Sequence, residues 1–329
     1  MNRSNLVREW RTKYPDMPSL KLARIIYNDG ENKLLFKDVE SVRSAIRYQE
    51  GKSGQENVTH LANTDLLKKE ARPKNPYKLP QSDETVYRPY HLKANKLLIL
   101  SDIHIPYHSI EAITSVLNFA KKEKPDAILL NGDTLDFFGL SKFCKDPRKR
   151  NFAEELQSFK EFICVVQKTF PSAKLYFKTG NHEERYFHYL WTKAKELVGV
   201  EEFELENIIK ARANNITLIS DKRIINFCGL NIIHGHEFST GFFSPVNVAR
   251  GLYLRGKTSA IQGHNHQSSE HTEPDMNGKI TTTWSTGCLC ELHPEYMPLN
   301  KWNHGFAIAD KVQSGFNLRN FRITKGTIL

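Results

Sequence analysis

The chain has 329 residues, of which 39% are hydrophobic and 26% are charged, and its formal net charge is +10. This composition excludes collagen-like, disordered and coiled-coil chains, and the length, about twice that of an average domain, predicts a large domain with a smaller module. The basic excess favours polyanionic partners and is densest in residues 1–95, which hold 18 Lys and Arg side chains against 12 Asp and Glu.

Three short helices are predicted in the first fifty residues. In the first, apolar residues recur every four positions from Leu6 to Tyr14, and Pro15 is expected to end the helix. Ser19 is expected to cap the second helix, and the third is expected to begin at about Asp38. The segment therefore predicts a small all-α module.

This N-terminal module, residues 1–50, has two interpretations. It can be a helix-turn-helix, whose last helix, carrying Arg43 and Arg47, would lie in the major groove of DNA. It can instead be a helical cap or an oligomerisation arm with a solvated basic face. The connection between the second and third helices, residues 30–37, is longer than the usual turn of about 3–4 residues, which favours the second interpretation.

A linker is predicted at residues 51–93, where prolines are frequent and apolar residues follow no period. Residues 94–329 are then expected to form the large domain. Its first half alternates strands and helices, which predicts a β-α-β-α-β unit with parallel strands. The strands are expected at 96–100, 127–130 and 174–177, and the helices at 110–120 and 152–166.

The second half of this domain is rich in strands, and it predicts a second sheet packed on the first. The strand-like runs beyond residue 215 are 216–219, 223–227, 230–233 and 280–284. Parallel strands joined by helices place ligands at the carboxyl ends of the strands. The residues that follow each strand are therefore where we expect the chemistry.

Five polar groups with metal-binding side chains follow strand-like runs of the chain. They are Asp102-x-His104, Gly132-Asp133-x-x-Asp136, Gly180-Asn181-His182-Glu183, His234-Gly235-His236 and Gly263-His264-x-His266. Side chains two apart on an extended segment point to the same face, so the Asp102 carboxylate and the His104 imidazole can bind one ion together. The glycines allow tight turns that bring the next polar side chain against a bound ion.

In order, spacing and residue type, these groups resemble the calcineurin-like metallophosphoesterase superfamily, over roughly residues 95–310. The resemblance implies a four-layer α-β-β-α sandwich that holds two divalent metal ions. It implies that the first ion is bound by Asp102, His104 and His266, and the second by Asn181, His234 and His264. Asp133 would bridge the two ions.

The resemblance also implies a mechanism. Two divalent cations about 3.5–4 Å apart can hold a phosphate and lower the pKa of a shared water, so that hydroxide attacks phosphorus in line. His182 corresponds to the family's catalytic histidine, expected to donate a proton to the leaving oxygen or to stabilise the developing negative charge, with Glu183 as its orienting partner. Asp136 is expected to be structural, and His236 is left outside the ligand set. Imidazole, carboxylate and amide ligands suit Mn²⁺, Fe or Zn²⁺, of which Mn²⁺ is the first expectation.

Two segments are expected to form substrate loops. They are residues 137–151 and 184–191, in which basic and aromatic side chains alternate, a composition that suits a nucleotide or single-stranded nucleic acid. A solvated charge run beside packed aromatic rings is the alternative. The protein serine/threonine phosphatase branch carries Arg-Gly after its second motif, and residues 137–139 here are Phe-Phe-Gly, which speaks against that activity. Residues 288–298 and 302–306 are expected to frame the site, and His293 and His304 receive no role.

The sequence thus predicts a metal-dependent phosphohydrolase acting on a nucleotide or nucleic acid, with the N-terminal module holding a polymeric substrate. The alternatives are a small-molecule phosphatase or cyclic phosphodiesterase, and a DNA-binding or assembly protein without activity. The oligomeric state stays open.

The cellular compartment is predicted from the lack of a membrane-spanning segment, a signal peptide and a disulfide pattern in the sequence. The apolar runs, for example 97–100 and 127–130, are far shorter than the ~20 residues that a membrane-spanning helix needs, and the N-terminus has no signal-peptide pattern. The five cysteines include no Cys-x-x-Cys pair, which argues against a disulfide framework or a zinc ribbon. We therefore expect a cytoplasmic protein with reduced thiols and no membrane partner.

Overall fold

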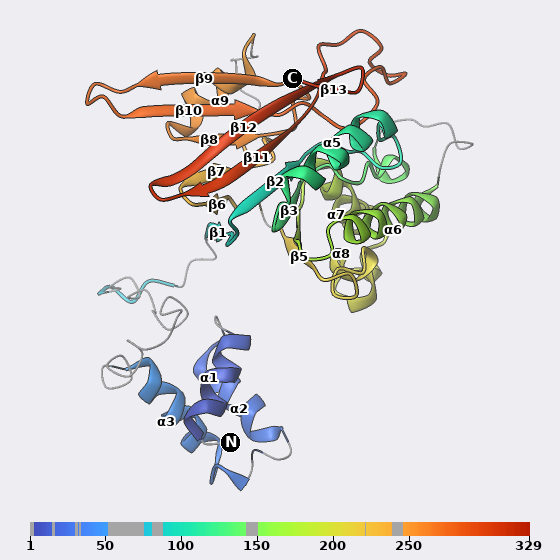
Figure 1. Ribbon diagram of the computed structural model, residues 1–329. Coiled ribbons are helices and arrows are strands. Elements are labelled where there is room, and N and C mark those ends of the chain that lie inside the picture. Colours follow the sequence, from blue (N-terminus) through green and yellow to red (C-terminus); the bar gives the residue numbers. More distant parts are fainter. Residues whose placement is uncertain are drawn as a thin grey trace. The chain divides into compact units, whose positions relative to one another are not determined.

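The computed structural model describes residues 3–14, 17–29, 32, 34–51, 76–80, 88–142, 151–220, 222–238 and 246–329. The chain divides into two compact units, Met1–Asp83 and Glu84–Leu329, each described here by itself (Figure 1). Most of the predicted linker, residues 52–75 and 81–87, lies outside the described residues. In the part that is described, no helix is both long and apolar enough to cross a membrane.

The smaller unit contains the three expected helices, α1 (Arg3–Lys13), α2 (Ser19–Asn28) and α3 (Val39–Glu50). Asp38 caps α3 as expected, because its side chain accepts the N–H of Ser41 while the Ser41 hydroxyl accepts the N–H of Asp38. The cap predicted for α2 is wrong by one residue. Pro18 holds the N-cap position, and the Ser19 hydroxyl contacts the Glu50 carboxylate instead.

A small apolar core and one buried ion pair hold these helices together. The buried apolar residues are Leu6, Val7, Leu22, Ala23, Ile26, Phe36, Val42 and Ile46. Arg11 of α1 pairs with Glu50 at the end of α3, and the side chains of both are almost fully buried. Removing either partner would leave an uncompensated charge inside a unit of about fifty residues, so this pair is a weak point of the fold.

The larger unit is built on two sheets that lie face to face (Figure 1). The first sheet has the strand order β13-β12-β11-β2-β3-β4-β5, and its strands β2 to β5 run parallel. Its strands are β2 (Lys96–Leu100), β3 (Ala127–Asn131), β4 (Lys174–Lys178), β5 (Ile216–Ile219), β11 (His304–Val312), β12 (Gly315–Thr324) and β13 (Thr327–Ile328). The parallel strands confirm the predicted β-α-β-α-β unit.

The second sheet has the order β1-β6-β7-β8-β10-β9. Its strands are β1 (Tyr90–His91), β6 (Ile225–Phe227), β7 (Leu230–Ile232), β8 (Ala260–Gln262), β9 (Ser269–Pro274) and β10 (Ile280–Ser285). One assignment from the sequence is wrong: the strand at 216–219, expected in this sheet, lies in the first sheet. It pairs parallel with β4 because the helices between them return the chain to the same sheet.

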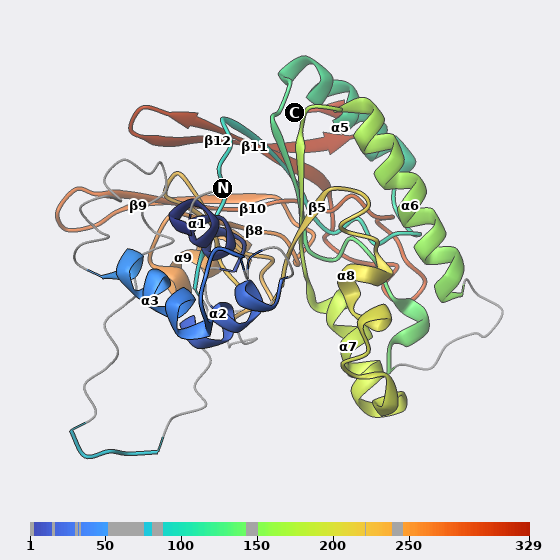
Figure 2. The same cartoon turned by 90° about the horizontal axis from the view of Figure 1, so that it is seen from below.

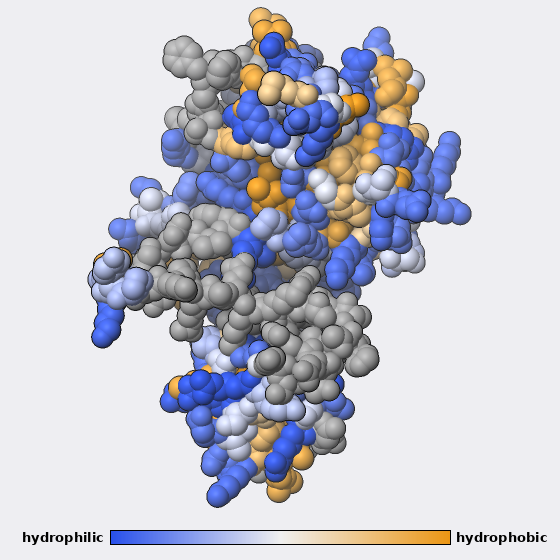
Figure 3. Space-filling view, turned by 90° about the vertical axis from the view of Figure 1, so that its left-hand side faces the viewer, coloured by the Kyte–Doolittle hydropathy of each residue, from blue (hydrophilic) through white to orange (hydrophobic). Residues whose placement is uncertain are grey.

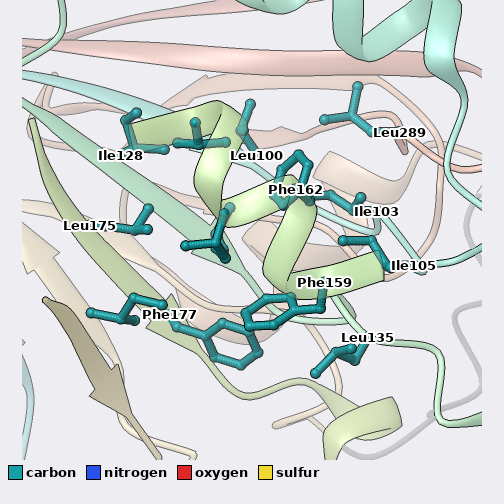
Figure 4. Packing of buried hydrophobic residues seen from close by; sticks show 14 of the residues in the cluster. Leu100, Ile103, Ile105, Ile128, Leu135, Phe159, Phe162, Leu175, Phe177 and Leu289 are labelled. Atoms are coloured by element: carbon teal, nitrogen blue, oxygen red, sulfur yellow. The ribbon is translucent and has the colours of Figure 1, made fainter. Parts of the chain in front are cut away.

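Side chains that alternate between the two faces of the first sheet divide the core into two layers. On β2, Leu97 and Ile99 face the second sheet, while Leu98 and Leu100 face the helices on the other side. Figure 4 shows this helical side, where the Phe159 ring from a helix meets the Phe177 ring from β4 edge to face, with centroids 5.9 Å apart. Because both faces of the first sheet are covered, its central strands consist of uninterrupted apolar residues.

Helices cover the outer faces of both sheets, which gives the four expected layers. The helices of the larger unit are α5 (Ile110–Glu123), α6 (Phe152–Thr169), α7 (Asn181–Lys193), α8 (Leu205–Ile208) and α9 (Val248–Gly256). Helices α5 and α6 lie on the outer face of the first sheet (Figure 2). Helix α9 packs on the second sheet through Leu252, which contacts Ala260 of β8. On the face drawn in Figure 3, polar side chains predominate and apolar ones show between them.

Candidate metal centre

The predicted metal-binding groups meet at the carboxyl ends of the strands. Asp102 follows β2, Asp133 follows β3 and Asn181 follows β4, whereas His234 and His264 follow β7 and β8 of the second sheet. The two sheets therefore each supply part of the centre.

The three residues expected at the first ion are adjacent and buried. His266 Nε2 lies 3.2 Å from Asp102 Oδ1 and 3.3 Å from His104 Nε2. All three side chains are at most 7% exposed. His266 Nε2 thus lies within 3.3 Å of a donor atom of each of the other two residues.

The residues expected at the second ion also meet. His234 Nε2 lies 3.1 Å from Asn181 Oδ1 and 3.3 Å from Asp133 Oδ2. Donor atoms of Asp133, His234 and His264 lie within 4.8 Å of one another. The same Asp133 oxygen is 3.9 Å from His104 Nε2, so it stands between the two groups.

The outer nitrogens of three candidate ligands are already occupied. His104 Nδ1 lies 2.9 Å from Asp136 Oδ2, His234 Nδ1 lies 2.9 Å from the Asn131 carbonyl oxygen, and His266 Nδ1 lies 3.8 Å from Cys290 Sγ. Such contacts orient the ring and leave Nε2 to face the metal. Asp136 thus has the supporting position expected for it, and Cys290 is a neighbour that the sequence did not indicate.

The electrostatics of the centre favour a cation. Burial disfavours the charged ring of His234, but Asp133 and Asp102 outweigh it and raise the pKa of His234 to about 10. In His266, Asp102 likewise outweighs burial and raises the ring pKa to about 10. Burial and the neighbouring His234 lower the pKa of His264 to about 4. The carboxylates of Asp102 and Asp133 therefore attract positive charge to the centre, and a divalent cation could supply that charge by displacing the protons of His234 and His266.

The backbone of the centre is strained. Five candidate ligands have positive φ angles, namely Asp102 (56°), His104 (52°), Asp133 (49°), His264 (66°) and His266 (56°). Such conformations cost about 1–3 kcal/mol each outside glycine and cluster at functional sites. Glycine is needed beside them: a Cβ on Gly132, whose φ is +82°, would lie 2.4 Å from His234 Nδ1, and one on Gly263 would lie 1.9 Å from Ser101 Oγ.

Glu183 does not orient His182, so this sequence interpretation is wrong. Its two carboxylate oxygens accept the backbone N–H groups of Asp133, Thr134, Leu135 and Gly180 at 2.7–3.0 Å. Adjacent residues on a helix point about 100° apart, so Glu183 at the start of α7 faces the loop while His182 faces the centre. Glu183 therefore holds the loop that carries Asp133.

Asp136, rather than Glu183, contacts the Nδ1 side of the His182 ring. His182 Nδ1 lies 3.0 Å from the Asp136 carbonyl oxygen and 3.3 Å from its carboxylate. Burial of the ring opposes its charge, but Asp133 and Asp136 raise the pKa of His182 above its usual value. His182 Nε2 lies 3.8 Å from Asp133 Oδ2, which places the ring at the edge of the centre.

A buried ion pair supports the loop that carries His234. Glu237 accepts the N–H groups of His234 and Gly235 at 3.0 and 2.6 Å, and it pairs with the fully buried Lys178 at 2.9 Å. The sequence offered one signal for this pair: a lysine at the end of an apolar strand needs a buried acceptor. His236 contacts Glu184 at 3.1 Å.

The expected substrate segments differ from the prediction in part. Residues 184–191 belong to helix α7 rather than to a loop, and residues 143–150 of the first segment lie outside the described residues. Trp302 lies beside the centre, with its ring 4.1 Å from that of His266, and Tyr296 follows at 6.4 Å from Trp302. His293 and His304 contact the carbonyl oxygens of Pro298 and Cys290.

Glu155 is a second buried carboxyl that supports the loop after β3. It accepts the N–H of Phe137 at 2.5 Å, and burial, reinforced by Asp136, raises its pKa to about 8. The folded state therefore binds a proton more tightly than the unfolded state, whose glutamate has a pKa of 4.5. This stabilisation is complete below pH 4.5 and is lost as the pH rises through about 8.

We expect the substitution Glu155→Gln to reduce this loss of stability at high pH, because the glutamine side chain is neutral at every pH. Its midpoint temperature of unfolding should exceed that of the wild type at pH 8.5 by about 2–4 °C or more, and should differ less at pH 5.5. Thermal unfolding of the full chain at both pH values measures this, with the exposed neighbour Glu154→Gln as the control. An identical pH dependence in wild type and Glu155→Gln would contradict the prediction.

The chain is similar to known proteins over the region that carries these residues. The family model for calcineurin-like phosphoesterases matches residues 95–278. The Gene 54 protein of Mycobacterium phage D29 is 24% identical over 181 residues, which are 53% of this chain and 70% of that protein.

Among solved structures, wild-type Vps29 from Entamoeba histolytica complexed with Zn²⁺ is 13% identical with a TM-score of 0.38, covering 71% of this chain and 96% of that chain. A dimetal phosphatase from Danio rerio is 10% identical with a TM-score of 0.34, covering 72% and 98%. The family model matches more than half of the chain and includes all five predicted groups in full. This protein therefore belongs to the calcineurin-like phosphoesterase family, whose members are metal-dependent hydrolases of phosphate esters.

Proposed function

We propose that this phosphoesterase holds two divalent cations and cleaves phosphate esters of nucleotides or nucleic acids. The observation that supports two ions is the position of Asp133 Oδ2 between two groups of donors, 3.3 Å from His234 Nε2 and 3.9 Å from His104 Nε2. The first ion would be held by Asp102, His104 and His266, and the second by Asn181, His234 and His264, with Asp133 shared.

The cations would supply a water of lowered pKa and neutralise charge on the phosphate. Nitrogen and oxygen donors suit Mn²⁺, Fe and Zn²⁺, and Mn²⁺ is our first choice. His182 would deliver a proton to the leaving oxygen. Its Nδ1 is held by the Asp136 carbonyl oxygen, which aims Nε2 toward the side of the centre where Asp133 lies.

Two features support a nucleotide or nucleic acid as substrate. The Trp302 ring lies against His266 and offers an aromatic surface beside the proposed first ion. In the smaller unit, Arg47 is exposed on α3 and its neighbour Tyr48 is 59% exposed. Basic and aromatic side chains together suit a polyanion whose bases can stack, so we propose that α3 holds a polymeric substrate.

Arg47→Ala is expected to weaken binding of an oligonucleotide by the full chain and to lower the slope of log K against log salt by about 1. The reason is the loss of one phosphate contact. Binding titrations at two salt concentrations measure it, and Arg24→Ala, which removes an exposed arginine from α2, is the matched control.

Equal salt slopes for the wild type and Arg47→Ala would contradict a nucleic-acid role for α3. The catalytic half of the proposal is tested separately with the oligonucleotide, nitrophenyl phosphate and bis-nitrophenyl phosphate as substrates. Cleavage of the oligonucleotide and the diester supports the proposal, whereas hydrolysis of nitrophenyl phosphate alone would favour a small-molecule phosphatase.

A further inference from the structure

A guanidinium group lies at the edge of the metal centre, and neither the family motifs nor the proposed ligand set accounts for it. Arg185 follows His182 by three residues on α7, so both side chains leave the same face of the helix. Arg185 Nη2 lies 2.8 Å from His182 Nε2, and His182 Nε2 lies 3.8 Å from Asp133 Oδ2. The His182 ring thus lies between the guanidinium of Arg185 and the Asp133 carboxylate, which the two proposed ions would share.

Asp136 holds this guanidinium in place. Arg185 Nη1 donates to the Asp136 carbonyl oxygen at 2.8 Å and to its carboxylate at 3.2 Å. The carboxylate also contacts His104 and His182, so one acidic residue positions a candidate ligand, the proposed proton donor and the arginine. An arginine fixed at one end presents its other donors in a preformed direction.

The contact with His182 is one that a substrate can replace. A guanidinium has donors only, so His182 Nε2 accepts in this arrangement, and its Nδ1–H donates to the Asp136 carbonyl oxygen. The nitrogen from which His182 would deliver a proton is therefore unprotonated and occupied by Arg185, and it can take up a proton from water once Arg185 has left it. A phosphoryl oxygen that enters the centre offers Arg185 a charged acceptor in place of a neutral one, and this exchange is favourable.

Arg185 also has N–H groups that make no hydrogen bond to the described residues. Of its five N–H groups, those on Nη1 and one on Nη2 are used, and the Nε–H and the second Nη2–H have no partner among the described residues. Its side chain is 21% exposed, so these donors are reachable from solvent. A planar fork with two open donors matches two oxygens of a phosphate.

We propose that Arg185 binds a phosphoryl oxygen of the substrate and releases His182 Nε2 as it does so. This assignment rests on the proposed metal centre and on the proposed role of His182, but not on the identity of the alcohol that leaves. It makes Arg185 a substrate-binding residue that recognises the phosphoryl group common to mono- and diesters.

The test measures binding of inorganic phosphate to the full chain by calorimetry, with and without added Mn²⁺, for the wild type and three variants. Arg185→Ala is expected to raise the dissociation constant of phosphate about 10–100-fold, the effect of losing a charge-assisted hydrogen-bond pair. Arg185→Lys should recover part of this loss, since it restores the charge without the fork. Arg212→Ala, which removes an exposed arginine paired with Glu206, is the matched control and should bind as the wild type does.

Steady-state hydrolysis provides the second readout. If Arg185 binds phosphate, KM for nitrophenyl phosphate should rise in Arg185→Ala together with the dissociation constant of phosphate. A phosphate affinity equal to that of the wild type, with and without Mn²⁺, would overturn the assignment even if kcat fell, because Arg185 would then act only through His182. Metal content, measured on the same samples, reports separately on the metal centre, so its failure and the failure of this inference are distinguishable.

Discussion

Replacing Asp133 by asparagine is expected to lower kcat/KM for nitrophenyl phosphate and bis-nitrophenyl phosphate by at least about 10³-fold. The side chain is 2% exposed, and its Oδ2 stands between the two groups of proposed metal donors. Asparagine keeps the size and one acceptor oxygen, so the N–H of His182, which Asp133 Oδ1 accepts at 2.9 Å, can stay bonded. The negative charge is lost, and shared charge of this kind is worth several kcal/mol in a centre of two ions.

The measurement uses metal-stripped protein with and without added Mn²⁺, and metal content is determined for each sample. Asp275→Asn is the matched control: its carboxylate accepts two N–H groups in the exposed turn at 275–279, far from any candidate ligand in the sequence, and asparagine suits such turns. Metal-restored turnover of Asp133→Asn at the wild-type rate would refute the assignment of a shared carboxylate.

Replacing Glu183 by glutamine is expected to lower the free energy of unfolding by about 3 kcal/mol or more and to reduce metal affinity. Each of its carboxylate oxygens accepts two backbone N–H groups: one oxygen serves Thr134 and Leu135, and the other serves Asp133 and Gly180. The residue is fully buried. In a glutamine, the NH₂ group would face two donors in either orientation, and unsatisfied buried donors are costly. The loop would shift, and Asp133 would move with it.

Thermal unfolding of the full chain and metal titration together test this prediction. Glu184→Gln is the matched control because it makes the same change one residue later on α7, where the carboxylate contacts His236 and the partly exposed Lys222. A smaller loss of stability is expected there. The assignment of Glu183 as the anchor of the Asp133 loop fails if Glu183→Gln unfolds at the wild-type temperature and binds metal with unchanged affinity.

Much of the fold follows from local sequence patterns. The three N-terminal helices, the alternating strands and helices of the first sheet and the presence of a second sheet were all predicted from apolar periodicity. Ile110, an apolar residue at the start of α5, departs from this pattern because it is 76% exposed. Apolar periodicity alone therefore does not decide burial at the end of a helix.

Pairing between distant segments was harder to predict. The antiparallel hairpin β11–β12 joins the first sheet beside β2, through pairs such as Ala307 with Ile99, although more than two hundred residues separate the two strands. The sequence of a strand does not specify which strand it pairs with, because pairing depends on backbone hydrogen bonds that nearly every residue can make. The same reason explains why the strand at 216–219 was assigned to the wrong sheet.

The sequence by itself determined which side chains are available to the centre. Strand ends, glycines and metal-binding residue types all appear in the local order of the chain, from Asp102 to His266, and the structure brings these residues together. Only the tertiary structure decided what holds them: Glu183 anchors a backbone loop, Asp136 orients two histidines, and Arg185 reaches the edge of the site. The physical reason is that ligand types are set by residue chemistry, whereas supporting hydrogen bonds depend on the directions in which side chains leave helices and loops that only the fold places side by side.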